Sequence, residues 1–210
     1  MLKFESYQFK RLSDNELIAV SGELRVNQSL QISGPSGVGK TTFLESLILS
    51  PSFNDQVIFE TKKINNAKNL KWLYQPAQNA FFDEWTAQEN LYYVLKNTTY
   101  LTKVEKRDLI TGLKDIFVKF KLKDIIQSKV AELSQGEKQR LGLLRSMLLK
   151  PALYLLDEPF SHLDDENVKF WSECFMGKLK ENSSLAIIVS HQNQLICDKQ
   201  ASLESNCLKF

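Results

Sequence analysis

Long apolar runs are missing from this chain of 210 residues. Its longest apolar stretches are interrupted by Arg145, Lys150, Pro151 and Asp157, so none approaches the roughly 20 residues needed to cross a bilayer. The first residues also lack the charged, apolar and small segments of a secretory signal, in that order. We therefore expect a chain that does not span a membrane and stays in the compartment where it is made.

Cysteine is scarce, and neither sign of charge prevails. Cys174, Cys197 and Cys207 are widely spaced, odd in number and without metal-ligand spacing, which is typical of ordinary thiols in a reducing cytosol. The 27 basic and 25 acidic residues give a net charge of +2. This balance is too even to indicate nucleic acid or an anionic membrane surface as a partner.

Dividing segments are absent as well, because no repeat, low-complexity tract or linker rich in proline and glycine interrupts the chain. A hydrophobic content of 43% allows the chain to bury a core without disulfide or metal cross-links. We expect residues 1–210 to form one domain, with internal divisions as subdomains. We expect residues 201–210 to close this domain without a further regulatory domain.

A glycine-rich pattern follows the apolar stretch 30–32. It reads Gly34-Pro35-Ser36-Gly37-Val38-Gly39-Lys40-Thr41-Thr42. Strand, glycine loop and helix follow one another as the pattern G-x-x-x-x-G-K-[ST] requires, with backbone N–H groups facing phosphates. Lys40 would reach the β and γ phosphates, and the Thr41 hydroxyl would bind Mg²⁺. This predicts a nucleotide-binding loop but does not separate transport ATPases from kinases and GTPases.

A second phosphate-binding place is predicted at the octet Leu133-Ser134-Gln135-Gly136-Glu137-Lys138-Gln139-Arg140. Ser134 and Glu137 have capping-box spacing, and leucines follow at helical intervals. An open helix N-terminus beside a hydroxyl and a glycine suits an anion. One nucleotide would need only one of the two places.

The octet resembles the signature motif of the ABC (ATP-binding cassette) ATPases, usually written LSGGQ. Gln135 stands where glycine is usual and Glu137 where glutamine is usual, while Lys138-Gln139-Arg140 resembles the basic continuation. In that family the signature helix of one subunit caps the terminal phosphate of ATP held by the phosphate loop of another. The resemblance implies a head-to-tail dimer in which Ser134 and Gly136 bind the partner's ATP.

Two carboxylates follow the apolar run 153–156. Asp157 would hold Mg²⁺ through its water shell, and Glu158 would orient or deprotonate the attacking water. Pro159 stops the strand, and the stretch Ser161-His162-Leu163-Asp164 resembles the D-loop of the family, which runs along the dimer interface. His162 replaces a small residue there, and we expect no catalytic role for it.

Two further positions match the family. His191, after the apolar run 185–189, matches the switch histidine that contacts the γ phosphate. Gln75, in Trp72-Leu73-Tyr74-Gln75-Pro76, resembles the Q-loop glutamine, which senses Mg²⁺ and the attacking water. The resemblance therefore implies an ATPase that hydrolyses ATP to ADP and phosphate with Mg²⁺. Its expected catalytic residues are Glu158, His191 and Gln75, and its expected metal-site residues are Thr41, Gln75 and Asp157.

Two features leave alternatives open. Tyr7, Phe9 and Arg11 are all candidates for stacking on adenine, and the sequence does not choose among them. The aromatic residues of Phe81-Phe82-Asp83-Glu84-Trp85 either fill the joint between the core and a helical insertion or receive a short helix from a membrane subunit.

The resemblance implies an α/β fold: a P-loop NTPase core, RecA-like, with a parallel sheet, an N-terminal antiparallel β subdomain and an inserted α-helical subdomain. Residues 1–85 and 150–210 would form the core with the β subdomain, and residues 86–149 the helical subdomain. Alternating apolar residues predict the antiparallel layer: Leu2, Phe4, Leu24, Val26, Leu30 and Ile32.

Local patterns predict the other elements. Thr86 with Glu89 and Thr102 with Glu105 form capping boxes. One amphipathic helix is expected through Leu109, Leu113, Ile116 and Phe120, and a crossover helix through Val168, Trp171, Phe175 and Leu179. The continuous apolar runs 153–156 and 185–189 are typical of strands buried on both faces of a parallel sheet.

The resemblance implies a transporter subunit that powers membrane permease partners from the inner face of the cell membrane, where it is cytoplasmic and peripheral. Its second ATPase subunit would be a copy or a paralogue. One alternative drives lipoprotein release or cell-wall remodelling through a membrane partner. A soluble ATPase acting on nucleic acid usually carries coiled-coil insertions, zinc motifs or fused cassettes, which this chain lacks. A P-loop kinase would not need a signature helix.

Overall fold

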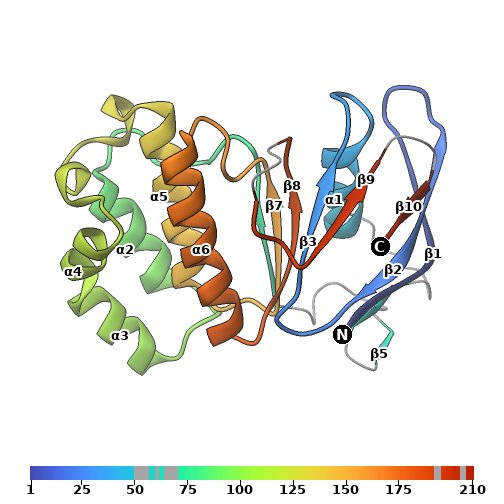
Figure 1. The fold of residues 1–210 in the computed structure, drawn as a ribbon. Helices are drawn as coiled ribbons and strands as arrows, with labels where there is room; N and C mark the ends of the chain where they lie inside the picture. The colour runs from blue at the N-terminus through green and yellow to red at the C-terminus, as the bar shows by residue number, and fades with distance from the viewer. Residues whose placement is uncertain (50–56, 60–61, 64–70, 192–194, 204–206) are drawn as a thin grey trace.

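Two five-stranded sheets organise the computed structural model, which describes residues 1–49, 57–59, 62–63, 71–191, 195–203 and 207–210 (Figure 1). The central sheet has the spatial order β6 (Trp72–Gln75), β7 (Leu153–Asp157), β8 (Leu185–Val189), β3 (Ser29–Ser33) and β9 (Lys199–Ser202). The second sheet has the order β10 (Cys207–Lys209), β2 (Leu17–Leu24), β1 (Leu2–Lys10), β4 (Val57–Phe59) and β5 (Lys62–Lys63).

The helices form layers on either side of the central sheet (Figure 1). They are α1 (Lys40–Leu49), α2 (Ala87–Asn97), α3 (Lys103–Thr111), α4 (Leu113–Lys119), α5 (Gln135–Leu148) and α6 (Asp165–Glu181), with short turns η2 (Lys123–Ile125) and η3 (Val130–Glu132). Helix α1 packs between the two sheets, and α5 and α6 cover the opposite face of the central sheet. The remaining helices lie beyond α5 and α6. Among the described residues, no helix is both long enough and apolar enough to cross a membrane.

The central strands are buried on both faces, as their continuous apolar runs predict. All five residues of β7 and all five of β8 are buried. Along β7, Tyr154 and Leu156 pack in the cluster with α5 and α6, whereas Leu153 and Leu155 pack in the cluster with α1 and the second sheet. Every pairing within the central sheet is parallel, which confirms the predicted parallel sheet.

The antiparallel layer is confirmed for β1 and β2 but not for the residues that follow them. Leu30 and Ile32 lie in β3, which pairs in parallel with β8 and β9 in the central sheet. Val26 lies in the turn after β2 and is 43% exposed. An alternating pattern over so few residues does not show to which sheet a strand belongs. In addition, Gln31, which lies between Leu30 and Ile32, is itself buried, so the strand does not have one polar, exposed face. The sequence also gave no sign that β10 joins β2 in parallel.

The capping boxes start the helices where the sequence predicts. Thr86, Thr102 and Ser134 cap α2, α3 and α5, and in each case the carboxylate of the glutamate three residues later accepts a hydrogen bond from the backbone N–H group of the cap residue. The predicted amphipathic helix is wrong in one respect, because Gly112 interrupts it between α3 and α4. Glycine costs more backbone entropy than other residues in a helix, which favours a break there.

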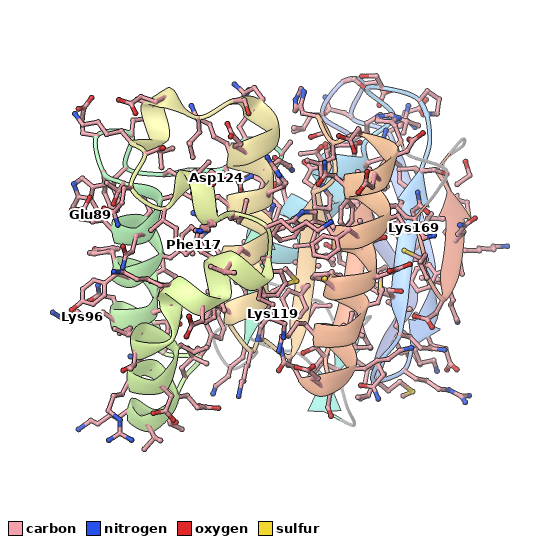
Figure 2. The ribbon with its side chains drawn as sticks, turned by 60° about the vertical axis from the view of Figure 1, so that its left-hand side comes forward. Glu89, Lys96, Phe117, Lys119, Asp124 and Lys169 are labelled. Atoms are coloured by element: carbon pink, nitrogen blue, oxygen red, sulfur yellow. The ribbon has the colours of Figure 1, made fainter. Side chains whose placement is uncertain are left out.

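The break lets α4 turn its apolar side inward. Phe117 is fully buried, whereas Lys119 on the same helix is exposed (Figure 2). Phe120, just after α4, stacks on Trp171 of α6 with ring centroids 5.6 Å apart. This contact joins the helical region to the helix that covers the central sheet.

Candidate functional site

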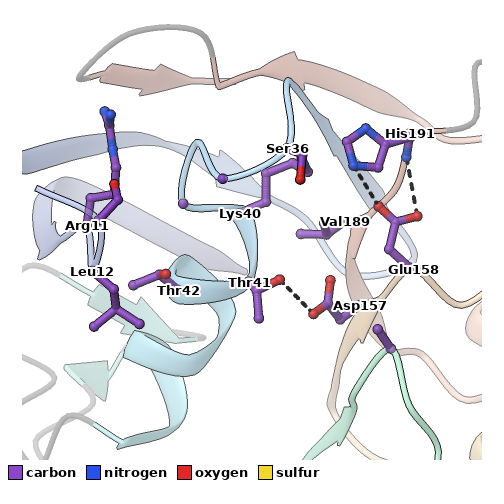
Figure 3. A pocket seen from close by; sticks show the side chains of 14 residues that line it. Arg11, Leu12, Ser36, Lys40, Thr41, Thr42, Asp157, Glu158, Val189 and His191 are labelled. Carbon is purple, nitrogen blue, oxygen red and sulfur yellow. Dashed lines mark hydrogen bonds and ion pairs between the residues drawn. The ribbon is translucent and has the colours of Figure 1, made fainter.

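Neighbouring strands of the central sheet run parallel, so β3, β7 and β8 end at the same edge. The segments after them border a cavity of about 480 Å³ (Figure 3). Its lining residues are Arg11, Leu12, Ser13, Ser36, Gly37, Gly39, Lys40, Thr41, Thr42, Ala77, Asp157, Glu158, Val189 and His191. Gly34, Pro35 and Val38 belong to the same loop but do not line the cavity. The structure thus brings together predicted site residues from three separate parts of the chain.

The loop before α1 is shaped to bind an anion. Gly34, Gly37 and Gly39 have φ angles of 143°, 78° and 106°, which glycine adopts without the steric cost that other residues incur. Helix α1 begins directly after them, at Lys40, so its free backbone N–H groups face the edge of the sheet. A phosphate group would find hydrogen-bond donors here.

The Lys40 ammonium folds back onto this loop. Its Nζ atom donates to the carbonyl oxygens of Gly34 and Pro35, at 2.7 and 2.9 Å. Burial lowers the pKa of Lys40, and the negative charges of Glu158 and Asp157 partly oppose that shift. Since the hydrogen bonds that Lys40 makes to the described residues all go to neutral carbonyls, a phosphate would stabilise this buried cation better.

Thr41 and Asp157 meet at the floor of the cavity. The Thr41 hydroxyl donates to Oδ2 of Asp157 at 2.8 Å, while Oδ1 of Asp157 is buried and has no hydrogen-bond partner in the described part of the chain (Figure 3). Burial raises the pKa of the Asp157 carboxyl above its usual range. Hard cations such as Mg²⁺ prefer carboxylate and hydroxyl oxygens, and a cation here would supply the partner that Oδ1 lacks. The donor set therefore fits Mg²⁺.

Glu158 occupies a strained backbone conformation beside Asp157. Its φ angle is 47°, in the left-handed region that residues other than glycine rarely adopt. Its N–H group donates to the carbonyl oxygen of Val189, and its own carbonyl accepts from Ser161 Oγ at 2.9 Å and from Gln139 Nε2 at 2.8 Å. Both ends of the residue are therefore held in place.

The Glu158 carboxylate faces His191. Oε1 of Glu158 lies 3.4 Å from Nε2 of His191, and the His191 backbone N–H group donates to Oε2 at 3.4 Å (Figure 3). Burial raises the pKa of Glu158, while the neighbouring His191 lowers it. A carboxylate with a raised pKa at the edge of the cavity is suited to accept a proton.

Gln75 does not line this cavity. Its side chain is 1% exposed, and its Oε1 atom accepts a hydrogen bond from Ser146 of α5 at 2.7 Å. Ala77, two residues further on, lines the cavity instead. The predicted contact of Gln75 with Mg²⁺ and the attacking water therefore requires its side chain to leave Ser146, and its role stays a prediction.

The start of α5 also lies apart from the cavity. Ser134 caps the helix through reciprocal bonds with Glu137, and it is exposed. Neither Ser134 nor Gly136 is among the residues that line the cavity. Within one chain, the two predicted phosphate-binding places remain separate.

The structure distinguishes the three candidates for stacking on adenine. Tyr7 and Phe9 are 3% and 4% exposed and pack in the core between the second sheet and α1. Arg11 lines the cavity, and Asp14 holds its guanidinium at 3.0 Å. Sequence reasoning missed its neighbour Leu12, which also lines the cavity and is 77% exposed. The available signal was an apolar residue beside the polar stretch Ser13-Asp14-Asn15.

The aromatic residues of segment 81–85 differ in their exposure. Phe81 is half-buried, with the Arg145 guanidinium 4.5 Å above its ring, and so fills the joint beside α5. Phe82 and Trp85 are 48% and 37% exposed and stack at 4.4 Å, with Tyr93 of α2 edge-on to both. We refer to Phe82, Trp85 and Tyr93 as the aromatic patch.

Curated proteins are similar to this chain in sequence. A molybdate/tungstate import ATP-binding protein from Pyrococcus horikoshii is 31% identical over 78% of the chain, which covers 47% of that protein. The chain therefore spans about half the length of the first curated relatives it matches. A lipoprotein-releasing system ATP-binding protein from Rickettsia bellii is 27% identical over 93% of this chain and 91% of its own length.

Solved structures share the fold. A putative ABC transporter ATP-binding protein from Pyrococcus furiosus superposes with a TM-score of 0.79 over 96% of both chains, at 21% identity. An ATP-binding cassette solved as a dimer with ADP and phosphate bound superposes with a TM-score of 0.75, at 20% identity, over 99% of this chain and 96% of its own. These likenesses confirm the predicted fold class.

A family model provides the assignment. The model described as ABC transporter matches residues 17–161, which is more than half of the chain. The match includes the loop at residues 34–42, the start of α5 and the carboxylates at the end of β7. The chain belongs to the ABC transporter family.

Proposed function

We propose that this chain is the ATP-binding subunit of an ABC transporter and that it hydrolyses ATP to ADP and phosphate in a head-to-tail dimer. The observation that carries the proposal is the convergence of Lys40, Asp157, Glu158 and His191 on one cavity next to a glycine loop. Family membership supports the same reading. The catalytic unit would be two ATPase subunits, either two copies or a copy and a paralogue.

Each residue has a distinct part in the proposed reaction. Backbone N–H groups of the loop and the Lys40 ammonium bind the β and γ phosphates, while Thr41 and Asp157 hold Mg²⁺. The bound Mg²⁺ neutralises charge on the phosphate oxygens. Glu158 accepts a proton from water as the water oxygen bonds to the γ phosphorus and the bond to the bridging oxygen of ADP breaks. His191 contacts the γ phosphate from beside Glu158.

The start of α5 acts across the dimer interface in this proposal. Its N-terminus is exposed and lies outside the cavity of its own chain, so it is available to a neighbour's nucleotide. Ser134 and Gly136 would contact the γ phosphate held by Lys40 of the other subunit. ATP would then stabilise the closed dimer because each nucleotide contacts both subunits.

The proposed location is the inner face of the cell membrane, reached through membrane-spanning partner subunits. The aromatic patch supports this part of the proposal, because exposed clusters of large apolar rings favour contact with another protein. Neither import nor export is preferred by the site itself.

A second candidate is mechanical work on a membrane partner without transport of a solute. The lipoprotein-releasing relative favours it, because that relative and this chain match over nearly their whole lengths. Purification of the complex in mild detergent, with mass spectrometry of the bound membrane subunits, distinguishes the two candidates. A permease-like partner supports transport, and a partner with a large domain outside the membrane supports mechanical signalling.

Replacing Glu158 tests the proposed base. Glu158→Gln removes the proton acceptor but keeps the shape of the side chain, so hydrolysis should fall by about 10²–10⁴-fold. ATP should still bind, and a dimer that depends on ATP should accumulate on gel filtration. Glu173→Gln, an exposed site on α6, is the matched control and should keep full activity. Wild-type turnover by Glu158→Gln would refute the assignment.

A mixture of two inactive variants tests the shared site. Ser134→Arg should spare ATP binding and block hydrolysis, because the damage lies in the neighbour's site. A mixture of Ser134→Arg and Lys40→Ala subunits should recover part of the activity. One of the two sites in each heterodimer then contains an intact Lys40 from one subunit and an intact Ser134 from the other. Thr102→Arg, which breaks an equivalent capping box on α3, should remain active. Heterodimers without any recovery would contradict the shared-site geometry.

The aromatic patch predicts a loss of partner binding. Phe82→Ala and Trp85→Ala should each reduce the amount of membrane subunit that co-purifies by at least about tenfold, as loss of a large aromatic anchor does. Val118 is an exposed apolar residue on α4, and Val118→Ala should leave the amount of co-purified membrane subunit unchanged. The patch is not the contact if both aromatic variants retain the partner and its stimulation of ATP hydrolysis.

A further inference from the structure

Helix α5 is hydrogen-bonded along one side to the last residue of β6 and to the segment that follows it. Near its C-terminal end, Ser146 donates to Gln75. At the preceding residue, the Arg145 guanidinium donates to the carbonyl oxygen of Ala80 at 2.6 Å. Nearer its N-terminus, the Gln139 side chain accepts from Asn79 Nδ2 at 3.1 Å. These contacts hold the segment against the helix over about two turns.

Asn79 is held tightly against α5. A Cβ atom added at Gly142 would lie 2.3 Å from Oδ1 of Asn79, so only glycine allows this approach. Oδ1 of Asn79 accepts from Arg145 Nη2 at 3.2 Å, and Nδ2 donates to Oε1 of Gln139. Both ends of the Asn79 amide are thus used, which fixes its orientation.

Asn79 in turn orients Gln139. Because Oε1 of Gln139 accepts from Asn79, its NH₂ group points the other way, where Nε2 donates to the carbonyl oxygen of Glu158 at 2.8 Å. Gln139 is only 4% exposed, so little water competes for these bonds. The reversed orientation of the amide would place two oxygen atoms against each other at the Glu158 carbonyl.

The hydrogen bond from Gln139 stabilises Glu158, whose backbone conformation is strained. Glu158 has a φ angle of 47°, which costs energy unless the surroundings hold it. Its carbonyl accepts from Gln139 and from both the N–H and hydroxyl groups of Ser161. Of these donors, Gln139 comes from a different element, so it sets the position of the Glu158 peptide relative to α5.

We propose that Gln139 is a positioning residue for the Glu158 carboxylate and that Asn79 acts through Gln139 by fixing its orientation. This inference rests on the proposed role of Glu158 as the base. Gln139 is not among the residues that line the cavity, so we expect its effect to fall on the geometry of proton transfer and not on ATP binding. Displacement of a catalytic group by about 1 Å can lower the rate by roughly a hundredfold.

The test compares Gln139→Met with Gln139→Glu. Methionine keeps the length and burial of the side chain but has no donor, and glutamate turns the donor into an acceptor facing a carbonyl. In the purified protein with its co-purifying subunits, kcat should fall by about 10–100-fold in both variants. KM for ATP should stay within about twofold, because the phosphate loop is unaffected. Ser172→Ala, which removes a buried hydroxyl from α6, should leave kcat unchanged.

A double-mutant cycle separates positioning from general damage. Asn79→Ala should lower kcat by itself but add almost nothing to Gln139→Met, because both act through one bond. Additive effects, an unchanged kcat in a folded Gln139 variant, or a rise in KM with an unchanged kcat would overturn the inference. If one Gln139 variant fails to fold, as judged by its thermal midpoint, the other variant and Asn79→Ala decide.

Failure of the inference and failure of the proposed function give different results. If Glu158→Gln is inactive and Gln139→Met has wild-type kcat, only the positioning role is lost. If Glu158→Gln keeps wild-type turnover, Glu158 is not the base and both are lost.

Discussion

The rest of the site depends on the burial of charged groups at the edge of the central sheet. Lys40, Asp157 and Glu158 lie where strands that are covered on both faces come to an end. Burial lowers the pKa of the amine and raises the pKa of both carboxyls, so each charged form is costly there. Within the described part of the chain their partners are incomplete, since Lys40 donates only to carbonyls and one Asp157 oxygen has no hydrogen-bond partner. A triphosphate with Mg²⁺ would satisfy both.

The parallel sheet places these groups within reach of one another, and α5 connects them to the rest of the molecule. Helix α5 packs on the central sheet, contacts the segment after β6 along one side, and reaches the Glu158 peptide through Gln139. The same helix starts at Ser134, on the surface proposed to meet the neighbour's nucleotide. One rigid element therefore links the proposed interface, the segment next to the aromatic patch and the proposed base. A shift of α5 would reach the Glu158 carbonyl through a single hydrogen bond.

Much of the site could be predicted because its signals are local. The loop at residues 34–42, the capping box at Ser134 and the apolar runs of β7 and β8 are each contiguous in sequence, and short-range sterics and burial determine them. The features that were not predicted depend on strand register and on contacts between residues far apart in the sequence. Tertiary packing determines three features that the sequence did not predict. They are the pairing of β10 with β2, the hydrogen bond between Asn79 and Gln139, and the position of Leu12 at the cavity. Alternation alone likewise could not assign Ile32 to a sheet.

The central claim is that the nucleotide lies between two subunits, with Ser134 of one facing Lys40 of the other. The most direct measurement is a crystal structure of the Glu158→Gln protein with ATP and Mg²⁺. We predict a dimer in which the N-terminus of α5 contacts the γ phosphate bound by the loop of the opposite subunit. A nucleotide fully bound within one subunit, with the N-terminus of α5 in solvent, would contradict the account.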